Sequence, residues 1–457
     1  MADRVSRAAR RDGFRRIGRY GCGAVLSAAG VILLTANPVL AQAAPDGAVT
    51  LQAELRQLLE SHPSLRASMG KVNAARERKR GAFAGYLPKV EFSAGGGHEV
   101  VDSPGTRAQG FTETREFRRN TTLTVTQNLF NGYATTEGRD RAGSQLKVEE
   151  FRLKALRQRL LFDGVLRYHR VLRGTRLVAL ARQNVTVLKR QLRLEDERVQ
   201  RGSGIAVDVL LAKTRLQLAI ERRVQLSGLL EEQEARYAQV FGHAPDQRRM
   251  KAPAIKLPAL EEKLDRAVAI AKESNPRLGV SGSQIEVEVH RKQIARAGYF
   301  PELNVVGTGN WEKNVDGIKG HRRDWSVTLR AKWALFSGFE TQAGVSAAAF
   351  EEAAARNVHR DQMRKVAQEL QIALQKLKTV RRRVELLANA VTIAQEVFDA
   401  RRKLRDAGRE TAINVLDAQS EVFAARINYV AARSDSAVAI YEVLHRTGLL
   451  TQDVLGL

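Results

Sequence analysis

The chain of 457 residues has one cysteine, ten prolines and three tryptophans. The single cysteine, Cys22, excludes an intrachain disulfide, and because it precedes the first apolar run we expect no lipid anchor on it. No proline occurs between Pro104 and Pro245 or after Pro301. Nothing in these two stretches therefore breaks a helix, and helices far longer than the usual three turns fit there.

The first 43 residues have the composition of a secretory signal peptide. Seven arginines from Arg4 to Arg19 precede an apolar run over 24–40, and Ala41-Gln42-Ala43 supplies small residues for cleavage. A transmembrane anchor is disfavoured, because the run falls short of about 20 apolar residues. We expect export, with cleavage after Ala43.

The charge of the chain is strongly basic. Removing the seven arginines and two aspartates of residues 1–43 lowers the formal net charge from +25 to +20. A nucleic-acid-binding protein would have a similar net charge. Here, however, the arginines are spread among glutamates along helical segments, without a basic block or interleaved aromatic residues. We therefore expect no nucleic-acid partner.

The sequence contains a tandem repeat. "GYLP", which ends at Pro88, returns as "GYFP", which ends at Pro301, at an offset of 213 residues. Further along, the offset becomes 206, as between Gly202 and Gly408. The difference of seven residues falls between the strand-like runs, where a loop can change length. Two copies of one structural unit are therefore expected.

This periodicity divides the chain into a signal peptide (1–43), a first repeat (44–242), a proline-containing linker (243–260), a second repeat (261–448) and a C-terminal tail (449–457). In the first repeat we expect a helical segment over 51–83, a strand pair over about 88–130, a long helix over about 135–200 and a helix over about 207–241. In the second we expect a strand pair over about 301–336 and helices over about 341–404 and 413–446.

The long helices have the apolar pattern of a coiled coil. In the second copy, spacings of four and three residues alternate without a break through Val366, Leu370, Ala373, Leu377, Val380, Val384, Leu387, Val391, Ala394 and Phe398. This 3.5-residue period is typical of left-handed coiled coils, whereas a simple amphipathic surface helix would drift off the seam. A helix of about 65 residues is about 100 Å long. The two shorter helices of a repeat together match that length, so we expect them to stack end to end beside it.

The clearest strand, Trp325 to Leu335, alternates apolar and polar residues. A half-buried strand of a soluble protein would also alternate. All three tryptophans, however, lie in or beside this hairpin, and Trp325 and Trp333 would be about 21 Å apart along a membrane normal, as in the aromatic girdles of membrane barrels. We predict a girdle of Trp311, Trp325 and Trp333. Four strands cannot close a barrel, which requires about eight, so several chains must contribute.

These features resemble the TolC family of outer-membrane channel-tunnel proteins of Gram-negative bacteria. The resemblance covers about Leu51 to Gly448 and rests on "GYLP/GYFP", "LFNG/LFSG" and the motifs "GSGIAVDVLLA" and "GRETAINVLDA". It implies a mainly α fold with β strands, in which a long helical coiled-coil tunnel through the periplasm joins a trimeric 12-stranded transmembrane β-barrel in the outer membrane, four strands per chain. The "LFNG/LFSG" motifs mark the expected strand–helix joints, at Phe130, Gly132, Phe336 and Gly338.

The resemblance also implies a transport protein without a catalytic site, cofactor or metal. The sequence agrees, because it has no phosphate-binding loop, no H-E-x-x-H and no CxxC. The partners implied are two further copies of the chain, a periplasmic adaptor protein, an inner-membrane ABC transporter and outer-membrane lipid.

The family's periplasmic aperture maps onto the two glycine-containing motifs. It implies aperture residues at Asp417, Asn414 and Asp208, and gate links among Arg201, Arg405, Arg409 and Glu410. One of the two acidic positions in the second motif is an asparagine here, so Asp417 would form one ring instead of two, and cation block would be weaker than in the family. For each of these charged residues the alternative is a solvated helix end.

The resemblance implies a passive duct, and our first hypothesis is the exit duct of a type I secretion system, which passes a polypeptide to the outside. The alternative is the outer component of a multidrug or metal efflux pump. A periplasmic coiled-coil scaffold without a pore is a third reading, from a different class of protein. The transported substrate does not follow from the sequence.

Overall fold

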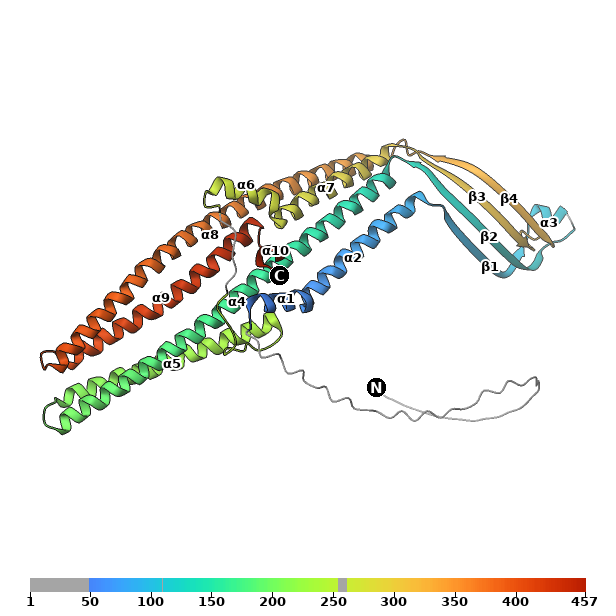
Figure 1. Ribbon diagram of the computed structural model, residues 1–457. Helices are drawn as coiled ribbons and strands as arrows, with labels where there is room; N and C mark the ends of the chain where they lie inside the picture. Colours follow the sequence, from blue (N-terminus) through green and yellow to red (C-terminus); the bar gives the residue numbers. More distant parts are fainter. Residues whose placement is uncertain (1–48, 109, 254–260) are drawn as a thin grey trace, which may run out of the picture. The chain divides into compact units, whose positions relative to one another are not determined.

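Apart from α3, helices and strands follow in the same order twice along the chain in the computed structural model, which describes residues 49–108, 110–253 and 261–457 (Figure 1). The predicted signal peptide and residues 254–260 of the predicted linker lie outside the described residues. The first repeat contains α1 (Leu51–Ser61), α2 (Pro63–Phe83), η1 (Ala84–Tyr86), β1 (Lys89–Val101), α3 (Pro104–Ala108), β2 (Thr114–Asn131), α4 (Ala134–Gln200) and α5 (Ala206–Phe241). The second contains α6 (Leu264–Ser274), α7 (Pro276–Arg296), η2 (Ala297–Tyr299), β3 (Glu302–Lys313), β4 (His321–Lys332), α8 (Glu340–Asp406) and α9 (Ala412–Thr447), and α10 (Gln452–Leu455) follows.

The helical segment expected over 51–83 is two helices, because Pro63 starts a new one. A proline lacks the N–H that would continue α1, but it is favourable as the first residue of α2. His62 caps α2 by accepting a hydrogen bond from Ser64 N at 3.2 Å. The second repeat breaks in the same way, where Asn275 accepts from Arg277 N at 2.9 Å.

The four strands form one antiparallel sheet in the order β1-β2-β3-β4. The pairing of β2 with β3 joins the hairpins of the two repeats. Strand β4 ends at Lys332, opposite Glu302, so the strand expected to reach residue 336 is shorter than predicted. Pro301 explains the difference: it precedes β3 and has no N–H with which to extend the ladder.

The sheet has one apolar face. Paired residues in neighbouring strands share a face, and the register aligns Phe92 with Leu123, Leu123 with Gly309 and Gly309 with Trp325. Large apolar side chains on this face are open to the surroundings; Trp325 is 81% exposed. The opposite face carries mostly threonine, asparagine and charged residues. We call the two sides the apolar face and the polar face.

The helical part is built around α4 and α8, each of 67 residues. Each packs against shorter helices of its own repeat, α4 against α2 and α5 and α8 against α7 and α9, and α4 also contacts α7 and α9. The predicted seam of α8 is buried from Val366 to Val380, half-buried in the middle and buried again at Phe398. No helix among the described residues is long and apolar enough to cross a membrane.

The strand–helix joints have the same backbone conformation in both repeats. Gly132 and Tyr133 have φ of +64° and +68°, and Gly338 and Phe339 have φ of +61° and +68°. At the first joint a Cβ on Gly132 would lie 2.7 Å from Ala297 O. Phe130, on β2, packs edge-on against Phe300. Phe336 lies beyond the end of β4 and contacts Phe339. The first joint is therefore packed against η2, whereas a Cβ on Gly338 would meet nothing within 4 Å.

We expect Gly132→Ala to destabilise the protein strongly. A left-handed backbone costs an alanine about 1 to 2 kcal/mol, and the clash with Ala297 O adds about 1 to 3 kcal/mol. The control is Gly242→Ala, which has φ of +82° but open space around it. The measurement is the free energy of unfolding of the detergent-solubilised protein; equal losses for the two variants would contradict the packing of this joint.

Candidate functional site

The ends of the two helical hairpins carry the predicted gate residues. The α4–α5 and α8–α9 hairpins turn at Gly202 and Gly408, both with φ of +73°. Glycine adopts this left-handed conformation without a steric penalty and is the usual residue after a helix C-terminus. The matching turns place Asp208 in the first turn of α5 and Asn414 in the first turn of α9.

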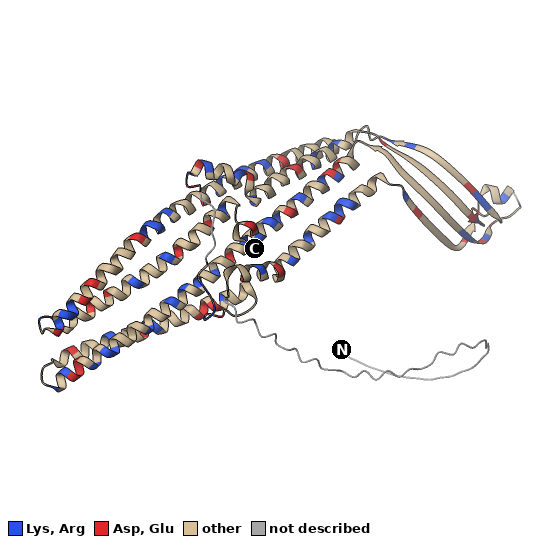
Figure 2. Cartoon of the chain, viewed as in Figure 1, with Lys and Arg blue, Asp and Glu red and all other residues tan. Residues whose placement is uncertain are grey.

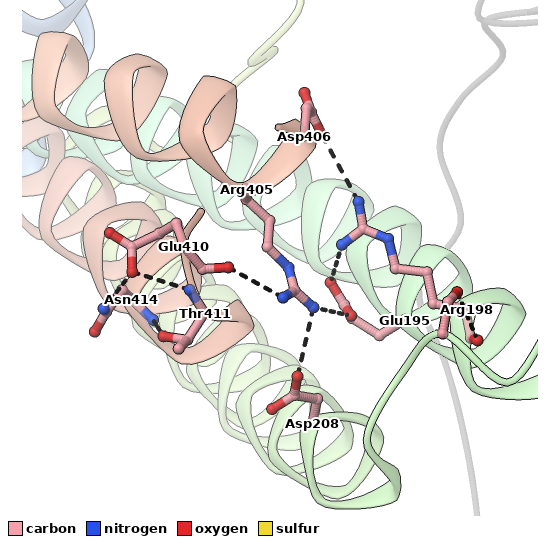
Figure 3. Close-up of polar contacts among 9 residues, drawn as sticks. Glu195, Arg198, Asp208, Arg405, Asp406, Glu410, Thr411 and Asn414 are labelled. Atoms are coloured by element: carbon pink, nitrogen blue, oxygen red, sulfur yellow. Dashed lines mark hydrogen bonds and ion pairs between the residues drawn. The ribbon is translucent and has the colours of Figure 1, made fainter. Parts of the chain in front are cut away.

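Arg405 links the two hairpins (Figure 3). From the end of α8 its Nη2 donates to Glu195 Oε2 of α4 at 2.7 Å and lies 3.4 Å from Asp208 Oδ2 of α5. Its Nη1 donates to the backbone oxygen of Glu410 at 3.1 Å. One guanidinium therefore holds three elements together, as its planar arrangement of donors allows.

The carboxylate that binds Arg405 is buried. The side chain of Glu195 is only 5% exposed, and its other oxygen accepts from Arg198 Nη1 at 3.2 Å. Arg198 also lies 3.8 Å from Asp406 of α8. Such a buried pair is costly to break, because the remaining charge is left without its partner.

Glu410 and Asn414 stabilise the turn of the second hairpin and do not cross to the first. The Glu410 carboxylate accepts hydrogen bonds from the Asn414 side-chain amide and from Thr411 N. These hydrogen bonds, together with nearby Arg401 and Arg405, lower the pKa of the Glu410 carboxyl below its usual value. Thr411 caps α9 by accepting from Asn414 N.

Two of the predicted gate links do not join the hairpins. Arg201 lies 3.8 Å from Glu197 of its own helix, and its side chain is 78% exposed. Arg409 is exposed, and its side chain has no ion pair within the described part of the chain. Among the four predicted gate residues, the structure brings Arg405 into the cross-hairpin contact.

Asp417 lies further along α9 and is paired. Arg215 Nη2 of α5 donates to Asp417 Oδ1 at 2.6 Å, and both side chains are partly exposed. Beside this pair, apolar side chains of α4, α5 and α9 pack together: Val185, Leu188, Ala212, Ala219 and Leu416. The negative charge of Asp417 is thus partly compensated within one chain.

Sequence reasoning missed Glu195, Arg198 and Arg215. For Glu195 there is a signal, because it continues a four-three spacing of apolar α4 residues that ends in Val185, Leu188 and Leu192. A carboxylate at a seam position of a coiled coil predicts a specific polar contact. Arg405 likewise continues the α8 seam, seven residues after Phe398. Arg215 lies beside the seam, and no spacing in the sequence indicates its partner.

The predicted girdle residues are in or beside the β3–β4 hairpin. The two that lie within strands, Trp311 and Trp325, are on the apolar face. Trp311 pairs with Arg323 and Trp325 with Gly309. Trp333 follows β4, and its Nε1 donates to Tyr299 O at 3.1 Å, next to η2. No group of histidine, cysteine or carboxylate side chains that could hold a metal ion occurs in the described ranges.

A repeat of two strands and one long helical hairpin, present twice in one chain so that the four strands form one sheet, defines a class of outer-membrane channel proteins. The chain belongs to the outer membrane efflux protein family, whose model matches residues 55–243 and 268–443. It is therefore an outer-membrane protein of a channel-forming family and not an enzyme. The predicted resemblance and location are confirmed, and a scaffold without a pore is not supported.

Several characterised relatives match along most of their length. The chain is 25% identical over 435 residues to the outer membrane efflux protein BepC of Brucella suis, covering 94% of this chain and 91% of that protein. It is 24% identical over 410 residues to the alkaline protease secretion protein AprF of Pseudomonas aeruginosa, covering 87% and 84%. The outer membrane protein TolC of Escherichia coli is 22% identical over 433 residues, with coverage of 90% and 84%.

Solved structures confirm the fold class. The outer membrane protein VceC of Vibrio cholerae superposes with a TM-score of 0.77 at 16% identity, covering 87% of this chain and 96% of that one. The open state of the MtrE channel of Neisseria gonorrhoeae gives 0.74 at 15% identity, covering 88% and 90%. The chain thus has the mainly α fold, with a small antiparallel sheet, of these channels.

We expect Arg405→Gln to loosen the hairpin ends. The change leaves Asp208 unpaired and Glu195 with Arg198 alone, which costs about 1 to 3 kcal/mol. Amide hydrogen exchange should accelerate in residues 195–210 and 403–415. Arg409→Gln removes the same charge from an exposed position and should leave exchange unchanged. Equal exchange in both variants would show that Arg405 does not hold the ends together.

Proposed function

We propose that three copies of the chain form one duct across the outer membrane and that this duct is the passive exit of a type I secretion system. Its partners would be a periplasmic adaptor and an inner-membrane ABC transporter, which supplies the energy. The observation that carries the proposal is that one chain leaves both edges of its sheet, β1 and β4, without a partner among the described residues. In lipid every such backbone group must be paired, so the sheet must close with other copies.

The open space beside Gly338, at the second strand–helix joint, supports the same arrangement. In the first joint Gly132 packs against Ala297 of η2. The residue equivalent to Ala297 in the first repeat is Ala84 of η1, whose neighbours Phe83 and Leu87 are each 52% exposed. A head-to-tail neighbour that paired its β1 with β4 would bring its η1 against Gly338. Such contacts close into a ring, and three copies supply twelve strands.

The hairpin ends are the proposed gate of this duct. Arg405 holds the α8–α9 hairpin to the α4–α5 hairpin through Glu195 and Asp208, and separation of the hairpins requires these contacts to break. Opening would therefore depend on a partner that supplies replacement interactions. We assign that role to the adaptor and transporter.

The choice of a polypeptide substrate rests on the relative AprF, which is named for protease secretion. The second candidate is the outer component of a drug or metal efflux pump, which the family description and the relative BepC favour. Both functions use the same passive duct, so they differ in the inner-membrane partner.

Deletion of the gene separates the two. The proposal expects a protein to disappear from the culture medium while sensitivity to drugs and metal ions stays the same. Complementation with the intact gene should restore secretion. Increased sensitivity with an unchanged set of secreted proteins would instead assign the chain to efflux.

The pair of Arg215 and Asp417 predicts how the aperture responds to cations. In planar bilayers, Asp417→Ala should relieve block of the conductance by divalent cations, because the ring of carboxylates is lost. Arg215→Gln should strengthen the block severalfold, because each carboxylate loses its counter-ion. Arg201→Gln is the control and should change neither. Unchanged block in the first two variants would place the constriction elsewhere.

A further inference from the structure

The apolar face of the sheet changes character beyond its tryptophans. Two residues past Trp325 along β4 stands Arg323, and two past Trp311 along β3 stands Lys313. Arg119 of β2 pairs directly with Lys313, and Trp311 pairs with Arg323. Because paired residues and alternate residues share a face, all three cations lie on the apolar face. We call Arg119, Lys313 and Arg323 the cation row.

The cation row brings like charges together without a carboxylate partner among the described residues, although Arg119 lies over the ring of Phe117, 5.4 Å from its centroid. Arg119 and Lys313 stand directly opposite each other, an arrangement that is destabilising between neighbouring strands. His321 is opposite Lys313 on the other side. None of the three cations has an ion pair with a carboxylate in the described ranges. Arg115, the next cation of β2 on this face, is paired with Glu113 of the adjoining loop at 2.7 Å.

The polar face at the same level is compensated. There Arg118 lies 3.2 Å from Glu99, and Arg322 lies 3.5 Å from Asp324. Lys and Arg mix with Asp and Glu toward the α3 end of the strands, while the middle of the sheet is mostly uncharged (Figure 2). The strand register determines which face each charged side chain occupies. The carboxylates of the strands lie on the polar face, and the cation row lies on the apolar face.

The level of the cation row matches a membrane surface. Arg323 is level with Trp311, and the Arg119–Lys313 pair lies about 7 Å further along the strands, so the row starts at the tryptophans that would mark the edge of the hydrocarbon and extends beyond them. Side chains of Arg and Lys at such a level extend toward the lipid headgroups. An anionic group presented by the surrounding lipid would relieve the repulsion between Arg119 and Lys313.

We propose that the cation row binds the phosphate groups of anionic lipid headgroups in the leaflet around the α3 end of the sheet. This inference rests on the proposed placement of the sheet in the membrane. The apolar surface on which the row stands favours a lipid over a soluble anion, because the same molecule can cover Val327 and Leu329 with its acyl chains. Guanidinium groups bind phosphate through parallel hydrogen bonds, and Lys313 adds a point charge.

The test measures lipid selectivity. The full-length protein is reconstituted in phosphatidylcholine vesicles, and the association of spin-labelled phosphatidic acid and spin-labelled phosphatidylcholine with it is compared by electron paramagnetic resonance. We expect a preference for phosphatidic acid. Each of R119Q, K313Q and R323Q should lower it about fivefold, and the triple variant should abolish it. The charge-retaining variant R119K/R323K should keep most of it, which separates binding from misfolding.

The matched control removes three cations from the polar face, in R118Q/R322Q/R330Q. This variant loses the same charge and should retain the preference. If the inserted protein prefers phosphatidic acid equally with and without the cation row, the inference is wrong. It is also wrong if inorganic phosphate at constant ionic strength abolishes the preference, because that result would indicate a soluble anion. Failure of the wild-type protein to insert into the vesicles would contradict the proposed function itself.

Discussion

Backbone hydrogen bonding in lipid is the constraint on which the rest of the molecule depends. Water is absent from the hydrocarbon, so a strand at the edge of a sheet has no substitute for a neighbouring strand. One chain supplies four strands and two unpaired edges. The duplication then has a physical meaning in the proposed trimer, where the contact between β2 and β3 within a chain would be the pattern for the contact between β4 of one copy and β1 of the next.

The same reasoning connects the sheet with the helices. Each repeat passes from strand to long helix through a left-handed glycine, and at the first joint a turn of the other repeat, η2, covers this glycine. In the chain itself this cover exists for Gly132 and is missing for Gly338. The tertiary structure of the single chain is thus incomplete at one edge, and its exposed aromatic and aliphatic side chains are consistent with that edge being an interface.

Much of the fold could be predicted from the sequence, because the spacing of apolar residues and the repeated motifs indicate helices and strands. Repeated motifs and a four-three spacing indicate long helices, and alternate apolar residues with clustered tryptophans indicate strands. The breaks at Pro63 and Pro276 and the early end of β4 were missed, since each depends on a missing N–H. Of the residues predicted for the gate, Arg405, three residues before Gly408, lies close to Asp208 in the motif that starts at Gly202, whereas Arg215 meets Asp417 only through the packing of α5 on α9.

Helices α4 and α8 have the same length, 67 residues each, and this length determines which residues meet at their far ends. Both helices start at equivalent strand–helix joints. Glu195 and Arg405 can meet because nearly the same number of helical turns separates each of them from its joint. Loss of one heptad from α4 alone would keep its seam intact yet move Glu195 by about 10 Å, out of reach of Arg405. Changes in the length of the tunnel must therefore occur in both repeats together, in steps of whole heptads.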